Sequence, residues 1–243
     1  MKDALKRLAY LLDTVNPIVF TLMVLAVVSM NLLANKSINT GLDWLALDCG
    51  ILFSWLIFLA MDVMTHCYGP KAATAGSLVA LALNLMVAAL FFVASLIPGT
   101  WGESYVEGSE AIINGALNNT VGGTWFVILG SSIAFATSAV VNNFLNYGIG
   151  RMLKSNDNFG SFALRSYVST FIGQFIDNIV FALLVSRTFF GWTTLQCVTC
   201  ALTGALLELL FEVFFSPVGY HISRHVLALR GQSADAVATE ARL

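Results

Sequence analysis

Charged residues are scarce in this chain of 243 residues: Asp, Glu, Lys and Arg together make up 11% of it, against about 25% in a typical soluble domain. Hydrophobic residues make up 58%, and the mean hydropathy is +0.80. A soluble fold with so few charges would leave much of its apolar surface in water. The composition therefore excludes an ordinary cytosolic enzyme and predicts a protein that is dissolved largely in lipid.

Basic charge and cysteine are also sparse. The formal net charge is −2, so the chain lacks the cationic field that captures nucleic acid. The four cysteines lie inside or beside apolar runs, which does not fit a disulfide scaffold. Cys197 and Cys200 have C-x-x-C spacing, but one such pair at the start of an apolar helix has low specificity, and we expect no metal or redox role.

Motifs of the common catalytic sites are missing as well. The sequence contains no HExxH, no phosphate-binding loop, no Rossmann glycine pattern and no GxSxG nucleophile motif. We therefore expect no enzymatic activity and no cofactor. We expect the partners to be a small-molecule substrate and the lipid bilayer, with no nucleic acid; assembly as a homo-oligomer is left open.

Long apolar runs dominate the chain instead. A membrane-spanning helix needs about 20 mostly apolar residues, and six runs approach or exceed that length. They lie near residues 17–34, 47–65, 72–97, 124–148, 166–186 and 195–215. We therefore expect one all-α domain over residues 1–230, a polytopic bundle of six transmembrane helices, followed by a disordered cytoplasmic tail over residues 231–243.

The distribution of cations predicts the orientation of the bundle. Ten of the twelve Lys and Arg residues fall in the N-terminal segment, the second and fourth connections and the C-terminal tail, whereas the other face has only Lys36 and Arg187. Because cytoplasmic loops carry the excess of Lys and Arg, both termini are expected to be cytoplasmic. The longest connection, residues 98–123, is then external, and its middle, residues 105–117, is predicted to form a short interfacial helix or a lid.

Four carboxylates fall inside the apolar runs. Asp62 lies late in the second run and Asp177 in the middle of the fifth, while Glu208 and Glu212 share one face of the sixth. A carboxylate at membrane depth costs several kcal/mol unless it faces a cavity or a partner. Either these acids pair with cations and hold the bundle together, or they serve a ligand or a proton. Cations at this depth are scarce, which favours the second interpretation.

The fifth run carries a polar stripe at three- and four-residue steps, formed by Ser166, Thr170, Gln174, Asp177 and Asn178. Polar side chains can hold helices together, usually for under about 1 kcal/mol each. A carboxylate and two carboxamides on one stripe exceed that need, so we expect this face to contact a substrate. Asn142, near the end of the fourth run, is a further candidate for the same site.

These groups suit a small, planar, polar molecule. A carboxylate accepts two parallel N–H bonds, and a carboxamide both donates and accepts, which matches the edge of a guanine-like base. The predicted substrate-binding residues are Asp177, Gln174, Asn178, Asp62, Asn142, Glu208, Glu212 and Thr170.

Three stretches resemble the vitamin-uptake-transporter-like family of queuosine-precursor transporters. They are residues 58–71 (FLAMDVMTHCYGPK), 133–146 (IAFATSAVVNNFLN) and 165–181 (RSYVSTFIGQFIDNIVF). The resemblance covers about residues 45–222 and implies six spans and uptake of a 7-deazaguanine, the cyano or aminomethyl precursor of queuosine, across the bacterial inner membrane. The family residues carried over are Asp62, Tyr68, Gly69, Arg165, Ser169, Thr170, Gln174, Asp177 and Pro217.

The chain also departs from the pattern of this family. His66 stands where Glu is usual, Asn142 where Asp is common, and Glu208 near a position that is usually Lys. A change from cation to anion implies a changed substrate preference, because an aminomethyl ligand would gain from Glu208 and Glu212 and a neutral cyano ligand would not. A carrier of another vitamin or purine-like heterocycle, a membrane-embedded enzyme and a scaffold without a ligand remain alternatives. Facilitated diffusion, proton symport and an external ATPase module all remain open.

Overall fold

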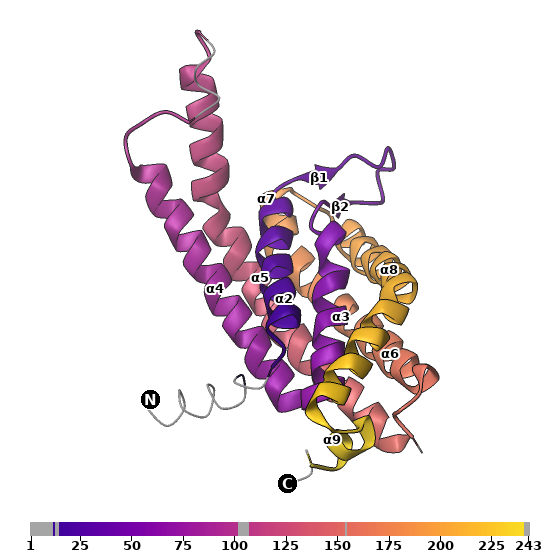
Figure 1. Cartoon of the computed structure of the whole chain (residues 1–243). Helices are drawn as coiled ribbons and strands as arrows, with labels where there is room; N and C mark the ends of the chain where they lie inside the picture. The colour runs from indigo at the N-terminus through magenta and orange to yellow at the C-terminus, as the bar shows by residue number, and fades with distance from the viewer. Residues whose placement is uncertain (1–11, 13–14, 102–106, 154, 241–243) are drawn as a thin grey trace.

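The computed structural model describes residue 12 and residues 15–101, 107–153 and 155–240 (Figure 1). The long helices are α2 (Pro17–Leu33), α3 (Ile51–Tyr68), α4 (Pro70–Leu96), α5 (Glu110–Met152), α6 (Phe159–Phe181) and α8 (Thr194–Arg230). The short elements are β1 (Ser37–Ile38), β2 (Leu47–Asp48), the π-helical turn η2 (Ala182–Ser186), α7 (Arg187–Phe189) and α9 (Ala234–Glu240). The antiparallel pair β1–β2 is the only sheet in the described part of the chain.

The expected all-α membrane bundle is confirmed. Five helical segments of the described chain are long and apolar enough to cross a bilayer, one of them running from α6 through η2 and α7. The sixth helix, α2, has 17 residues, which is at the lower limit of about 17–25 for a spanning helix. Each of the six apolar runs thus corresponds to one helix, although the start of the second run forms β2.

Local sequence signals explain where several helices begin. The Asn16 side chain accepts hydrogen bonds from the backbone N–H groups of Ile18 and Val19, and Pro17 is the first residue of α2. Thr193 and Gln196 form a capping box at the start of α8. Between α3 and α4, Gly69 has a φ of +82° and a ψ of 167°, a conformation that is essentially restricted to glycine.

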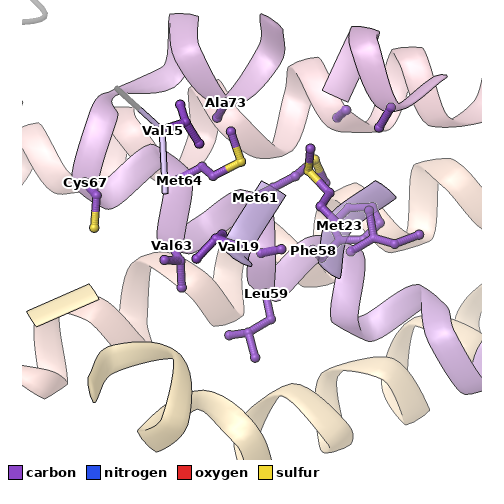
Figure 2. Close-up of a cluster of buried hydrophobic side chains, with 14 of the residues drawn as sticks. Val15, Val19, Met23, Phe58, Leu59, Met61, Val63, Met64, Cys67 and Ala73 are labelled. Atoms are coloured by element: carbon purple, nitrogen blue, oxygen red, sulfur yellow. The ribbon is translucent and has the colours of Figure 1, made fainter. Parts of the chain in front are cut away.

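Helix α3 lies at the centre of the bundle and α4 at its periphery. Within the most apolar 18 residues of each helix, 67% of α3 is buried but only 22% of α4. Val19, Met23, Phe58 and Met61 belong to the apolar core in which α2 and α3 meet (Figure 2). The outward side of α4 instead exposes large apolar side chains such as Leu90 and Val93, as expected for a helix that faces lipid.

The two ends of the bundle differ in chemistry. The cationic end, defined by Lys71, Arg151, Arg224 and Arg230, contains the start of α2, the α3–α4 turn and the end of α8; the hairpin end contains β1, β2 and α7 (Figure 1). Lys2, Lys6, Arg7, Lys154 and Arg242, on which the orientation prediction also depends, lie outside the described residues. That the cationic end is cytoplasmic therefore remains a prediction.

Helix α5 is longer than the apolar run that predicts it. It begins at Glu110 rather than near residue 124, and its first turns project from the bundle at the hairpin end together with the end of α4 (Figure 1). The prediction of a short helix or lid over residues 105–117 is therefore wrong for residues 110–117, which belong to α5. Residues 105 and 106 lie outside the described residues. Hydropathy marks the apolar part of a helix, whereas the helix itself continues into the polar segment.

The C-terminal tail also differs from expectation. Of the segment expected to be disordered, residues 234–240 form α9, and residues 241–243 lie outside the described residues. Ala234 and Val237 are buried, and the Asp235 carboxylate accepts hydrogen bonds from the backbone and side-chain nitrogens of Asn156, at 2.9 and 3.0 Å. These contacts dock α9 on the α5–α6 connection.

Candidate functional site

A polar cavity lies between α2, α3, α6 and α8, close to the hairpin end. Its empty space, including open solvent at its mouth, is about 450 Å³. Its polar lining consists of Asn31, Asp48, Ser54, Ser131, Asp177, Asn178 and Glu208. Met30, Ile51 and Phe181 are among the apolar lining residues, so the cavity combines a few polar groups with apolar walls.

Glu208 links three of the helices that surround this cavity. One carboxylate oxygen accepts a hydrogen bond from the Ser54 hydroxyl on α3, and the other accepts one from the side-chain amide of Asn178 on α6, at 3.2 Å. Glu208 is almost fully buried. The two donors hold its carboxylate at the cavity wall in a fixed orientation.

Two further carboxylates face the same cavity. Asp177 accepts a hydrogen bond of 2.8 Å from the Ser138 hydroxyl on α5. Asp48, the last residue of β2, accepts one of 2.7 Å from the backbone N–H of Gly50. Burial raises the pKa of Asp48 to about 6, although the bond from Gly50 acts in the opposite direction.

The cavity has an acidic lining without a matching cation. Within the described chain, neither Asp177 nor Glu208 forms an ion pair, and their polar contacts are the hydroxyl and amide groups just named. The interpretation in which these acids lock the bundle by pairing with Lys or Arg therefore does not hold for the described residues. Such a lining attracts a ligand that is cationic or rich in N–H donors.

A second polar cluster, here called the inner network, lies deeper between α3, α5, α6 and α8. It consists of Asp62, Asn142, Ser166, Thr170 and Glu212, all of them buried. Asp62 accepts hydrogen bonds from the Asn142 amide at 2.9 Å, from the Thr170 hydroxyl at 3.1 Å and from the Ser166 hydroxyl. The Ser166 oxygen also contacts a carboxylate oxygen of Glu212.

Gln174 occupies the same face of α6, between the inner network and the cavity. Its side chain is fully buried, yet neither its oxygen nor its nitrogen has a hydrogen-bond partner within the described chain. An unsatisfied buried polar group costs about 1–3 kcal/mol, so such a group calls for a physical explanation. An amide in this position can both donate to and accept from a polar ligand.

The structure divides the eight predicted binding residues into two groups instead of gathering them in one site. Asp177, Asn178 and Glu208 line the cavity. Asp62, Asn142, Thr170 and Glu212 belong to the inner network, and Gln174 lies between the groups. Glu208 and Glu212, one helical turn apart on α8, connect the two levels.

Other residues of the site were not identified from the sequence. Asn31 and Asp48 line the cavity, and Ser138 orients Asp177. Asn31 interrupts the first apolar run, which is a signal that sequence reasoning could have used. Asp48 stands at the edge of the second run, where a charge usually marks only the end of a span.

Three residues carried over from the family resemblance lie at the cationic end, away from the cavity. Tyr68 accepts a hydrogen bond of 2.8 Å from the backbone N–H of Asn16, and Gly69 forms the α3–α4 turn. Buried Arg165 donates to the Asn146 side chain at 2.8 and 3.1 Å and to Asn156 at 3.0 Å. These contacts join α2 to α3 and join α6 to α5 and the α5–α6 connection at the cationic end.

A sequence model of the family described as "putative vitamin uptake transporter" matches residues 48–222. No curated protein matches the chain, and no solved structure matches it. The matched segment includes the whole inner network and the cavity residues from Asp48 onward.

Proposed function

This chain belongs to the putative vitamin uptake transporter family, and we propose that it imports a queuosine precursor, 7-cyano- or 7-aminomethyl-7-deazaguanine, across the bacterial inner membrane. Membership in this family and the apolar helices make it a multi-pass membrane protein with a transport function.

The observation that supports this function is the acidic cavity. Asp177 and Glu208 face it without a cationic partner in the described chain, and Asn178 stands between them. A guanine-like edge carries neighbouring N–H donors, and a carboxylate accepts two parallel N–H bonds. Asp177 would bind that edge, Asn178 would contact an adjacent polar atom, and Phe181 in the apolar wall would contact the face of the ring.

The lining also bears on the choice between the two precursors. Glu208 and Asp48 would attract the ammonium group of the aminomethyl compound, while the cyano group is neutral and carries no donor. We therefore expect the aminomethyl precursor to bind more tightly. This preference follows from two acids in one cavity and not from the family as a whole.

The arrangement of the two ends supports transport by alternating access. The cavity opens near the hairpin end, whereas Arg165, Asn146 and Asn156 form a hydrogen-bonded closure at the cationic end. Release of a substrate on that side requires these contacts to separate. In this proposal the structure corresponds to a state that is open toward the hairpin end and closed toward the cytoplasm.

Uptake of labelled precursor into cells that lack their own transporter tests the proposal. We expect the chain to restore uptake and Asp177→Asn to abolish most of it, because the amide replaces one acceptor oxygen by a donor. Asp43→Asn is the matched control, since Asp43 is exposed and away from the cavity. Restored uptake that is equal in both variants would remove Asp177 from the site, and no uptake by the expressed protein would refute the substrate.

Ligand-dependent thermal unfolding of the purified protein in detergent separates the remaining alternatives. A carrier is stabilised by the ligand that it binds and leaves it chemically unchanged. An enzyme would release a product from the same compounds, a carrier of another heterocycle would respond to that heterocycle alone, and a scaffold would respond to none.

A further inference from the structure

We infer that Glu212, Ser166 and Asp62 form a proton-binding site that couples uptake to a proton gradient. The coupling rests on the proposed transport function, whereas the binding of the proton does not. The three side chains come from α8, α6 and α3, and all are fully buried. Nothing in the family match assigns this site.

The contacts of Ser166 with Asp62 and Glu212 require more hydrogen atoms than the serine alone provides. The Ser166 oxygen is in hydrogen-bond contact with Asp62 on one side and with Glu212 on the other. A serine hydroxyl carries a single hydrogen atom, and an ionised carboxylate only accepts. If both acids were ionised, one of the two contacts would join a pair of oxygens without a hydrogen atom between them. One of the acids must therefore be protonated.

The remaining contacts show which acid holds the proton. Asp62 accepts from Asn142 and Thr170 in addition to Ser166, a set of donors that stabilises a carboxylate. The second oxygen of Glu212 is buried without any hydrogen-bond partner. An ionised carboxylate with a bare oxygen in an apolar interior is far more costly than a neutral acid, so Glu212 is the protonated member and donates to Ser166.

This arrangement allows a balanced proton transfer. The Glu212 O–H gives its proton to the Ser166 oxygen while the Ser166 O–H gives its own to Asp62. The products are an ionised Glu212 and a neutral Asp62, and the serine is unchanged. One proton moves from α8 to α3 without any cofactor, so either acid of the pair can hold it.

The surroundings do not supply a competing charge at hydrogen-bond distance. The titratable neighbours on the packed helices are His66 on α3, Arg165 and Asp177 on α6, and Glu208 on α8. Helix α5 contributes the amide of Asn142. Arg165 is engaged with Asn146, Asn156 and His66, and in the described chain it makes no hydrogen bond to either acid.

A metal ion is a poorer occupant than a proton. The oxygens of Asp62, Ser166 and Glu212 contact each other directly, whereas a hard cation separates its oxygen ligands because each lies about 2.0–2.6 Å from the ion. No group of three or more His, Cys, Asp or Glu side chains in the described residues could hold a metal ion. A sodium ion is nevertheless a distinct outcome of the transport test.

The proton site lies next to the substrate cavity. Glu212 is one turn from Glu208, which lines the cavity, and Thr170 is one turn from the unpartnered Gln174. Loss of the proton places a second negative charge beside Asp62, so the carboxylates repel each other and α8 is driven away from α3 and α6. A helix movement of this kind would change the cavity and link proton release to substrate release.

Reconstituted vesicles test the coupling. Purified protein is placed in vesicles with an alkaline interior, and accumulation of labelled 7-aminomethyl-7-deazaguanine is followed with and without a protonophore. We expect the wild-type protein to accumulate the label and the protonophore to abolish accumulation. Glu212→Gln, which imitates the protonated acid, should bring the label only to equal concentration on both sides. Glu107→Gln, at an exposed position, should behave as the wild type.

A substrate-free measurement tests the proton itself. The infrared band of a protonated carboxyl group is recorded at neutral pH for the wild type, Glu212→Gln and Ser166→Ala. We expect Glu212→Gln to remove one such band and Ser166→Ala to shift it, because the acid loses its acceptor. Identical carboxyl bands in the wild type and Glu212→Gln would refute the assignment, and so would accumulation that follows a sodium gradient instead of the pH gradient.

The two experiments separate failure of the inference from failure of the proposed function. If no deazaguanine enters the vesicles under any gradient, the proposed substrate is wrong, and the infrared band still decides whether Glu212 holds a proton. If the label equilibrates but never accumulates with the pH gradient, the substrate is supported and the coupling is refuted.

Discussion

Gly204 on α8 lies against Asn178 on α6 so closely that a Cβ atom at position 204 would come within 2.7 Å of the Asn178 amide nitrogen. The same amide donates to Glu208 at 3.2 Å. Absence of a side chain at position 204 therefore lets α6 and α8 bring an amide and a carboxylate to one wall of the cavity.

We expect Gly204→Ala to reduce substrate binding more than it reduces stability. The added methyl group displaces the end of the Asn178 side chain, which can rotate, and the bond to Glu208 is lost. A typical hydrogen bond contributes about 0.5–1.5 kcal/mol, so binding should weaken about two- to tenfold. Equilibrium binding of labelled precursor to the protein in detergent measures this change.

Gly148→Ala is the control for this substitution. Gly148 is also inside a helix, α5, but a Cβ atom there would meet nothing within 4 Å. Alanine is favoured over glycine in a helix by about 1 kcal/mol, so this variant should bind normally and be at least as stable. Equal loss of binding in both variants would contradict the role given to the α6–α8 contact.

Glu208→Gln should change the preference between substrates more than total uptake. The carboxamide keeps an acceptor for Ser54 but removes an acid that can pair with an ammonium group. A hydrogen bond to a charged group contributes about 1.5–3 kcal/mol, so affinity for the aminomethyl precursor should fall tenfold or more while affinity for the cyano precursor stays about the same. Competition between the two labelled compounds measures the ratio. An unchanged ratio would show that Glu208 does not contact the ammonium group.

Asp48 predicts a pH dependence of the same preference. Burial is the main cause that raises its pKa to about 6, so Asp48 is largely neutral at pH 5 and largely ionised at pH 7. Because the charge appears as the pH rises through about 6, binding of the cationic aminomethyl precursor should strengthen over this interval and binding of the cyano precursor should not. Asp48→Asn should flatten that part of the profile. A profile that is identical in wild type and Asp48→Asn would assign the pH effect to another group.

The membrane architecture was predictable from the sequence because a lipid-exposed helix needs a continuous run of apolar residues, and such runs are visible in the sequence. Each of the six apolar runs corresponds to a helix, and the stripe on the fifth run correctly predicted that Ser166, Thr170 and Asp177 share a buried face of α6. The ends of α5 and the fold of the tail were not predictable in this way. Helix α9 depends on contacts between Asp235 and Asn156, which are 79 residues apart.

The division of the acids into two levels could not be read from the sequence either. Helical periodicity shows that Glu208 and Glu212 share one face of α8, but not what stands opposite each of them. The structure places Asn178 and Ser54 at Glu208, and Ser166 at Glu212. Which helices face one another at each depth is decided by packing among all of them.

Arg165 should be among the most important residues for stability. It is 3% exposed, and its guanidinium donates to the Asn146 backbone and side chain and to Asn156. Each buried acceptor that is left unsatisfied costs about 1–3 kcal/mol, so Arg165→Met should lower stability by several kcal/mol. Arg165→Lys should recover only part of the loss, because an ammonium group lacks the planar fork. Thermal unfolding in detergent measures both.

Arg224→Met is the comparison for Arg165. Arg224 is exposed and makes one hydrogen bond, of 3.3 Å, to the Asp157 carbonyl. Surface substitutions of this kind usually change stability by about 0.5 kcal/mol or less. A similar loss of stability in the two variants would show that the buried hydrogen bonds of Arg165 contribute little.

Asp235 should control whether α9 stays docked on the α5–α6 connection. Burial alone would raise the pKa of Asp235, but hydrogen bonds from Asn156 and Ser155 hold the pKa below its ordinary value of 3.8. A carboxylate with a depressed pKa stabilises the folded state above the pKa of the unfolded chain, and this contribution is lost as the pH falls through the lower value. At neutral pH the stabilisation is therefore complete, and acidification below about 3.8 should begin to release α9.

Hydrogen exchange over residues 234–240 measures this docking directly. Asp235→Ala should increase exchange in α9 at neutral pH, because the helix then loses its bonds from Asn156 and keeps only the burial of Ala234 and Val237 and the bonds to Asp157 and Tyr147. Thr239→Ala is the control, since the Thr239 hydroxyl bonds only within α9, to the Asp235 carbonyl at 2.9 Å. Because Asn156 also accepts from Arg165, release of α9 should in turn weaken the closure of the cationic end and raise leakage of substrate from vesicles. If exchange rises in both variants alike, α9 is held by its own helicity and not by Asp235.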